Sequence, residues 1–147
     1  MSRRQFVALG AAGVSAIALA GPAQAVAEDR LWQTVGQFAA SGAIGRVRNA
    51  SILLHDAHTS IDVRALEAVD RLREALNLPE PVSSGFAHNP LSGWFSMSCR
   101  FSTGVTFAVA AVSGITETRY TIRGERGGIH VEGARVYLET DGHWTER

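Results

Sequence analysis

A two-layer α+β fold is predicted for this chain, with two amphipathic helices packed on a curved, cone-like antiparallel sheet of about five strands. Apolar residues follow a helical spacing between residues 29 and 77 and alternate with a period of two between residues 94 and 146. The Leu-Pro-Glu-Pro sequence at residues 78–81 separates the two patterns. Residues 26–147 are enough for one hydrophobic core and too few for two, so we expect a single domain.

The first helix is expected between a capping Asp29 and a stop at Ser41-Gly42. Its apolar residues fall at helical spacing: Leu31, Trp32, Val35, Phe38 and Ala39. The apolar run at residues 51–54 that follows is compatible with either a strand or a second helical piece.

A second helix is predicted from a cap at Ser60 or Asp62 to Asn77. Its expected apolar stripe consists of Leu66, Val69, Leu72 and Leu76. Its expected water-facing residues are Arg64, Glu67, Arg71 and Glu74, with Glu67 placed to pair with Arg71 one turn later.

The second half predicts an antiparallel meander of short strands joined by turn residues. The expected strands are 94–101, 105–112, 116–123, 129–140 and 143–146. Between Val131 and Val136 the inward-facing apolar residues change from odd to even positions, which predicts a β-bulge at Gly133-Ala134. The glutamates of this half alternate with Arg119, Arg123 and Arg135, and we expect cross-strand ion pairs.

The N-terminus carries an export signal pattern: Ser2-Arg3-Arg4-Gln5-Phe6 followed by Val7, a mild Ala/Gly-rich stretch, and Ala23-Gln24-Ala25. It resembles a twin-arginine signal peptide, which implies recognition of Arg3 and Arg4 by the twin-arginine export machinery and a periplasmic or secreted protein. A general secretory signal and an uncut anchor are the alternatives. Gly21-Pro22 are expected to break any helix here.

Cleavage is expected after Ala25, or alternatively after Ala27, so residues 1–25 are the signal peptide and 26–147 the domain. The cleaved chain keeps 12 arginines against 14 acidic residues, since Arg3 and Arg4 leave with the leader. These arginines are scattered, which predicts no nucleic-acid partner. No stable membrane span is expected after cleavage.

Cys99 is the one cysteine of the chain, so no internal disulfide can form. Alternation places Cys99 on the same strand face as Phe95, Met97 and Phe101. We therefore expect a buried, protonated thiol that packs as a small hydrophobic side chain.

The histidines provide a candidate metal site. His55, Asp56 and His58 lie within four residues ahead of the second helix, and a fold that brings His88 across would complete a ligand set for a divalent ion such as zinc. The alternative is that these residues serve only as turn and capping residues.

A ligand cleft is the second candidate site, formed by Trp94, Arg100, His143 and Trp144 at the rim of the sheet. Aromatic rings beside a cation suit a small apolar or anionic ligand. The alternative is that both tryptophans only complete the core.

The function expected from these patterns is an exported domain that binds a small ligand or a partner protein without catalysis. The alternative is a metal-dependent or acid/base enzyme that uses the His55/Asp56/His58 loop, or Asp56 with Tyr120 or Tyr137. Sequence motifs for a serine nucleophile elbow, a dinucleotide turn, a phosphate loop and a Cys-x-x-Cys pair do not occur.

The leader makes a prediction that intact mass spectrometry checks. Protein exported with its own leader and purified without chelator should have the mass of residues 26–147, because Ala23 and Ala25 supply the small residues that signal peptidase requires. An additional metal ion would favour the histidine site, and an organic adduct the ligand cleft. An uncut mass would contradict the assignment of residues 1–25 as a cleaved signal.

Overall fold

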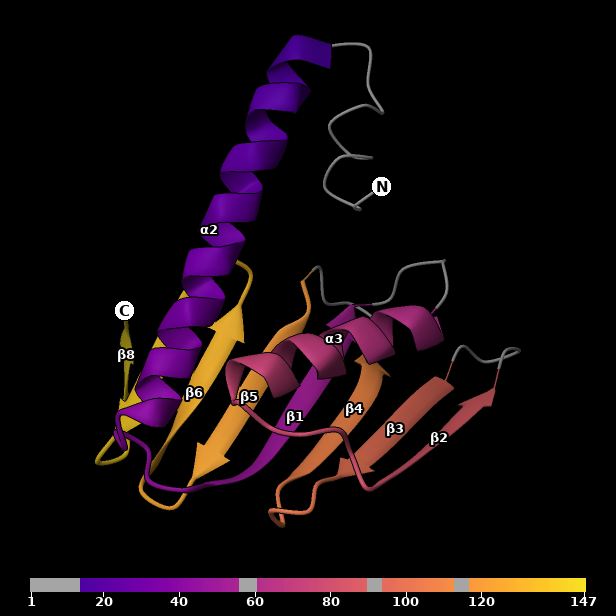
Figure 1. Ribbon diagram of the computed structural model, residues 1–147, viewed down its shortest axis with the longest axis vertical. Helices are drawn as coiled ribbons and strands as arrows, with labels where there is room; N and C mark the ends of the chain where they lie inside the picture. The colour runs from indigo at the N-terminus through magenta and orange to yellow at the C-terminus, as the bar shows by residue number, and fades with distance from the viewer. Residues whose placement is uncertain (1–13, 56–60, 90–93, 113–116) are drawn as a thin grey trace.

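The computed structural model describes residues 14–55, 61–89, 94–112 and 117–147. These residues form two layers, an eight-stranded sheet and two helices that lie on one of its faces (Figure 1). In chain order the elements are α2 (Val14–Ala40), β1 (Val47–His55), α3 (Ile61–Ala75), β2 (Ser83–Asn89), β3 (Trp94–Arg100), β4 (Thr106–Val112), β5 (Arg119–Gly124), β6 (Gly127–Glu132), β7 (Arg135–Thr140) and β8 (His143–Glu146).

The sheet is mixed, which corrects the predicted antiparallel sheet of about five strands. The strand order is β2-β3-β4-β1-β5-β6-β7-β8, and β1 pairs in parallel with β4 while the other neighbours are antiparallel. The chain therefore places β1 in the middle of the sheet, then crosses over through α3 and returns by β2 and β3 to β4.

Most of the difference between the predicted and the observed number of strands comes from β1 and β2. The run at residues 51–54 is part of β1, in which Ala50, Ile52 and Leu54 are buried; the apolar Leu53 between them hides the alternation in the sequence. The sequence SSGFAHN of β2 has no alternation at all, since every residue of this edge strand is exposed. Hydrogen bonding to β3, and not burial, makes it a strand.

The predicted bulge at Gly133-Ala134 is a hairpin turn. The structure has two strands, β6 and β7, where the sequence predicts one, and Glu132 pairs with Arg135 across the turn. Gly133 has a φ of 58°, the left-handed conformation that glycine adopts at little cost. A β-bulge and a two-residue turn both shift the inward-facing residues from odd to even positions. The sequence pattern therefore does not distinguish a bulged strand from a hairpin.

Helix α2 starts earlier than predicted. It begins at Val14, continues through Gly21-Pro22, and includes Asp29 instead of being capped by it, so these expectations were wrong. Its first half extends beyond the sheet and α3 (Figure 1). No helix among the described residues is both long and apolar enough to cross a membrane.

The contact faces of the two helices are largely as predicted. In α2, Val35 is fully buried, and Leu31, Trp32, Phe38 and Ala39 pack against the core. In α3, Val69 and Leu72 are buried as expected, together with Ala65 and Ala68. Leu66 was expected in this stripe but is 54% exposed, because the small residues Ala65 and Ala68 are the ones that face the sheet.

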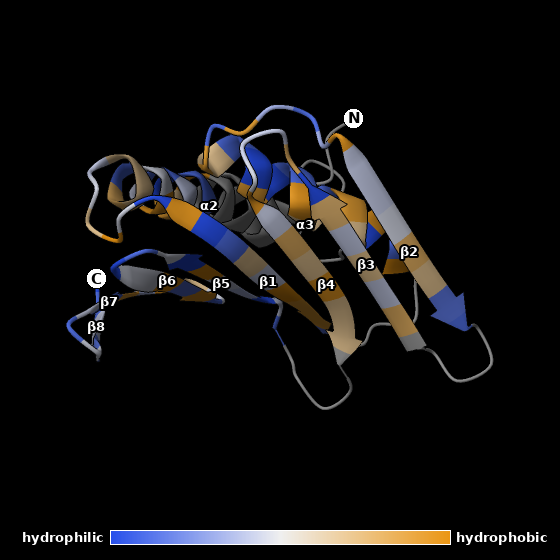
Figure 2. Ribbon diagram, turned by 90° about the horizontal axis from the view of Figure 1, so that it is seen from below, coloured by the Kyte–Doolittle hydropathy of each residue, from blue (hydrophilic) through white to orange (hydrophobic). Residues whose placement is uncertain are grey.

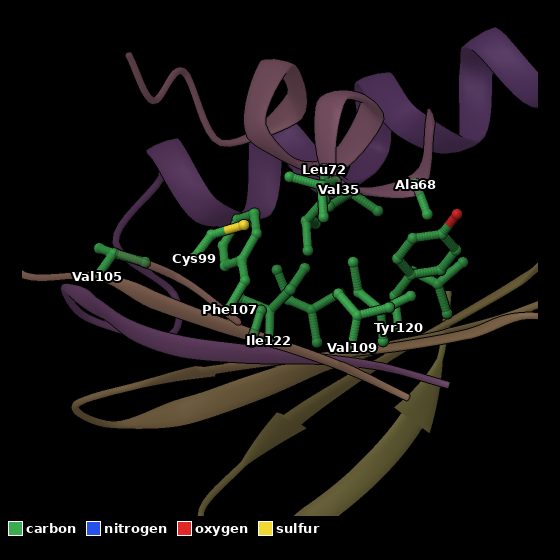
Figure 3. Packing of buried hydrophobic residues seen from close by; sticks show 14 of the residues in the cluster. Val35, Ala68, Leu72, Cys99, Val105, Phe107, Val109, Tyr120 and Ile122 are labelled. Carbon is green, nitrogen blue, oxygen red and sulfur yellow. The ribbon is translucent and has the colours of Figure 1, made fainter. Parts of the chain in front are cut away.

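The core lies between the helices and one face of the sheet. Val35 and Leu72 point down from the helices toward Phe107, Val109 and Ile122 of the sheet (Figure 3). Each methylene group buried there stabilises the folded state by about 0.8 kcal/mol, so this single layer is the main source of stability.

The opposite face of the sheet is not covered by any described residue (Figure 2). Along β1, β3 and β4 the residues that alternate with the core positions are exposed or half-buried, as Ser51, Ser98 and Ala108 illustrate. We call this surface the bare face.

Cys99 is 3% exposed and lies within the core, which confirms the expectation of a buried thiol (Figure 3). Burial raises the pKa of the Cys99 thiol, and the negative charge of Asp70 raises it further.

The raised pKa predicts how stability depends on pH. Because the unfolded chain ionises Cys99 first, the free energy of unfolding should be independent of this group below the ordinary thiol pKa of 9.0 and should fall as the pH rises above it. Urea unfolding from pH 7 to pH 10 measures the slope, at most about 1.4 kcal/mol per pH unit. Cys99→Ala should remove this part of the slope, and an unchanged slope in that variant would contradict the assignment.

Candidate functional site

An open cleft of about 500 Å³ lies between α2, α3 and the ends of β1 and β5. Its walls come from five parts of the chain: Ala27 to Trp32 of α2, Arg64 to Arg71 of α3, Leu54-His55 of β1, Glu117 to Tyr120, and Val131 to Ala134 around the β6–β7 turn. Gly36 of α2 lies against the backbone of Ala75 of α3, and the two helices diverge from this contact (Figure 1). The cleft lies between the diverging parts.

The apolar wall of the cleft is built on an aromatic pair. Trp32 of α2 meets Tyr120 of β5 edge to face, with ring centroids 4.8 Å apart and planes at 83°. Tyr120 is 9% exposed, and its hydroxyl oxygen points toward Ala68 of α3 (Figure 3). The phenol therefore presents a polar atom at the boundary between the core and the cleft.

The rim of the cleft is charged. Arg71 of α3 forms an ion pair with Glu28 of α2, which ties the two helices together across the opening. Arg64 donates a hydrogen bond from Nη1 to the carbonyl oxygen of His55 at 2.7 Å. This contact fixes the start of α3 to the end of β1.

His55 and Glu117 complete the polar wall. Nδ1 of His55 lies 3.2 Å from Oγ1 of Thr118, so the imidazole is positioned by the residue that precedes β5. The carboxylate of Glu117 lies against Gly133, where an added Cβ would clash with both carboxylate oxygens. Glycine at the β6–β7 turn therefore makes room for this carboxylate at the cleft.

The cleft offers hydrogen-bond donors and acceptors beside aromatic rings. Two guanidinium groups, three carboxylates (Glu28, Glu67, Glu117), one phenol and one imidazole line it. Such a lining suits a small molecule with several polar groups.

The predicted metal ligands are only partly described. His55 lies at the cleft, whereas His88 is exposed on the edge strand β2 and packs against Phe95. Strands β3 and β4 separate β2 from β1, a distance of about 14 Å at usual strand spacing. The structure therefore does not bring His88 to His55.

Asp56 and His58 lie outside the described residues, so their part of the metal site stays a prediction. Among the residues that the structure describes, no group of three or more metal-binding side chains occurs.

The predicted ligand cleft is likewise not assembled. Trp94 and Arg100 lie at the two ends of β3, and His143 and Trp144 lie on β8 at the far edge. Five strands separate β3 from β8, about 29 Å. Trp144 instead packs under the guanidinium of Arg123, 5.2 Å from its ring centroid.

The expected cross-strand ion pairs form at Arg119 and Arg123, two of the three arginines for which they were predicted. Arg119 pairs with Glu132 at 3.2 Å, and Arg123 pairs with Glu139. Tyr120 and Tyr137, the candidates for acid/base catalysis, lie on opposite faces of the sheet, since Tyr120 belongs to the core and Tyr137 alternates with the buried Val136 and Leu138.

The cleft residues Glu28, Arg64 and Arg71 were not predicted as site residues. Arg64, Glu67 and Arg71 form a charged stripe at helical spacing on α3, which the sequence analysis assigned to solvent. The stripe faces a cleft only because α2 runs beside it, and no pattern within α3 indicates that neighbour.

No family model and no curated protein matches this sequence. Solved structures do share its fold. One is a protein from Thermotoga maritima whose name assigns it to the oxidoreductases, with a TM-score of 0.63, 17% identity, and coverage of 78% of this chain and 43% of that one. Another is an oxidoreductase from Agrobacterium radiobacter in complex with NAD+, L-tartaric acid and magnesium, with a TM-score of 0.58, 17% identity, and coverage of 80% and 42%.

A third neighbour is a super-repressor mutant of Gal80p from Saccharomyces cerevisiae, with a TM-score of 0.62, 11% identity, and coverage of 80% and 42%. At these identities the likeness shows the fold alone, and this chain spans less than half the length of the proteins it matches. The expected role in binding without catalysis is nevertheless contradicted, because the neighbours are mainly oxidoreductases.

The described residues do not fit a nicotinamide dinucleotide. Dinucleotide-binding halves have a doubly wound parallel sheet and a glycine-rich turn from a strand into a helix. Here one of seven strand pairings is parallel. The connection from β1 to α3 has the sequence Asp-Ala-His-Thr-Ser and contains no glycine.

The aromatic pair makes a stability prediction. Trp32→Ala should lower the free energy of unfolding by about 2–4 kcal/mol, because it removes the edge contact with Tyr120 and opens the base of the cleft. Leu66→Ala, an apolar truncation at an exposed position of α3, serves as the control and should change it by less than about 0.5 kcal/mol. Equal losses in denaturant unfolding would show that Trp32 has no special packing role.

Proposed function

We propose that this chain is the substrate-binding domain of an oxidoreductase, and that the cleft between α2 and α3 holds a small, uncharged, hydroxylated substrate. The observation that carries the proposal is the coincidence of an oxidoreductase-like fold with one polar, aromatic-walled cleft of suitable size. A volume of about 500 Å³ is within the range of small-molecule sites.

The charges of the cleft favour an uncharged substrate. The two arginines and three glutamates give a formal charge of −1, and Arg71 is already paired with Glu28. Carboxylates accept hydrogen bonds from hydroxyl groups, and guanidinium groups donate hydrogen bonds to them. Trp32 supplies an apolar surface for the carbon-bound hydrogens of the substrate. The solved complexes of two fold neighbours contain glycerol and L-tartaric acid, both hydroxylated compounds.

The cofactor would be held elsewhere. NAD or NADP, which the names of several fold neighbours mention, would take or give the hydride, and we assign it to a separate domain of the same or another chain. The role of this chain's residues is then to bind and orient the substrate. The phenol of Tyr120 and the imidazole of His55 are the groups placed to move a proton at a substrate hydroxyl.

We also propose that the domain is exported through its twin-arginine leader. The first half of α2 extends beyond the body, so cleavage after Ala25 leaves the contacts of Leu31, Trp32 and Val35 in place. Export of an already folded domain is compatible with a core that needs no disulfide.

Binding to the cleft is tested by NMR titration of residues 26–147 with glycerol, D-glucose and L-tartrate. We expect saturable shifts at the amides of Trp32, Arg64 and Tyr120 with a neutral probe, and weaker effects from the tartrate dianion. Glu117→Gln should weaken binding about 5–10-fold by replacing a charged acceptor. Glu80→Gln, at an exposed glutamate outside the cleft, is the matched control.

Two results would overturn the proposal. One is the absence of saturable shifts at the cleft with all three probes. The other is micromolar binding of NADH or NADPH to this domain alone, which would place the dinucleotide on residues that we find unsuited to it.

A further inference from the structure

The bare face of the sheet has two unlike halves. The residues on it lie in rows across the strands, because directly paired residues point to the same side of a sheet. One row runs Gly85, Ser98, Ala108, Ser51, Thr121, His130, Tyr137 and Glu146 from β2 to β8.

The half formed by β2, β3, β4 and β1 carries small, uncharged residues at its centre, and we call it the small half. Two shallow depressions of about 500 and 610 Å³ cross it. Ser98, Ala108 and Ser51 lie at its centre. No charged group converges on these depressions at their centre, so they do not have the character of a small-molecule site.

The half formed by β5, β6, β7 and β8 carries large side chains, and we call it the large half. Trp144 is 42% exposed there, and His130 contacts both Tyr137 and Trp144. Four charged residues of this half are paired within the chain, Arg119 with Glu132 and Arg123 with Glu139, and Arg135 is stabilised by the nearby negative charges of Glu146 and Glu132. Burying an ion pair in an interface has a smaller desolvation penalty than burying an isolated charge, because the two partners attract each other.

The strand order places four strands in each half, with the boundary between β1 and β5. We propose that a second copy of this chain covers the bare face, related by a two-fold axis that runs along this boundary. Such an axis places the small half of each copy against the large half of the other copy. The same contact between a small half and a large half therefore occurs twice in the dimer.

The rows then match large residues with small ones. Along the row given above, Tyr137 lies opposite Ser98 of the second copy, and His130 lies opposite Ala108 of the second copy. Two aligned sheets pack about 10 Å apart, a spacing that large side chains fill when small ones face them.

The area of the bare face agrees with a stable dimer. Eight strands of about six residues span roughly 700 Å², and specific interfaces bury about 800 Å² per partner.

Sedimentation or light scattering of residues 26–147 at about 20 µM tests the proposal. We expect the mass of a dimer. Ala108→Arg should give a monomer with unchanged circular dichroism, because the side chain projects from the bare face into the space that His130 of the second copy fills. Leu66→Arg, an equally drastic change at an exposed position on the helical side, should leave the dimer intact.

A swap of residues distinguishes this arrangement from other dimers. Tyr137→Ser and Ser98→Tyr should each raise the dissociation constant at least about 10-fold, and the double variant should recover most of the loss because large again faces small. A monomeric parent protein, a dimer that tolerates Ala108→Arg, or a double variant no better than the singles would overturn the proposal.

Discussion

Burial of one face of an eight-stranded sheet under two helices is the constraint on which the rest of this structure depends. Each strand contributes every second residue to that face, and the core residues of β1, β3, β4, β5, β6 and β7 all belong to it. A helix about 10 Å across covers about two strands, so two helices leave part of the sheet edge and the whole opposite face without cover. The bare face and the exposed edge strands β2 and β8 are direct consequences.

The cleft follows from the same constraint. Helices α2 and α3 approach each other over the core and separate over the ends of β1 and β5, where the Glu28–Arg71 ion pair bridges the opening. The charged stripe of α3 therefore lines a concavity instead of facing open solvent. This arrangement lets one small domain combine an apolar core with a polar site that shares Tyr120 with that core.

The predicted elements agree with the structure where neighbouring residues determine them. Strands β3, β4, β5 and β8, the turn at Asp141-Gly142 and the contact face of α2 were all predicted within three residues, because alternation, helical spacing and turn residues are local properties. The buried Cys99 and the presence of cross-strand ion pairs at Arg119 and Arg123 followed from the same alternation, although their particular partners did not. The strand β2 was missed because exposed edge residues carry no apolar pattern.

The sequence by itself determined the type of most elements and most of the side chains that enter the core. Only the tertiary structure decided that β1 lies in the middle of the sheet, that His88 and Trp144 lie far from their predicted partners, and that Arg64 and Arg71 line a cleft. The physical reason is that side-chain burial depends on periodicity within a segment, whereas the order of strands depends on hydrogen bonds between segments more than 70 residues apart, as between the strands that pair Asn49 with Arg123. Spacing along one segment carries no information about those partners.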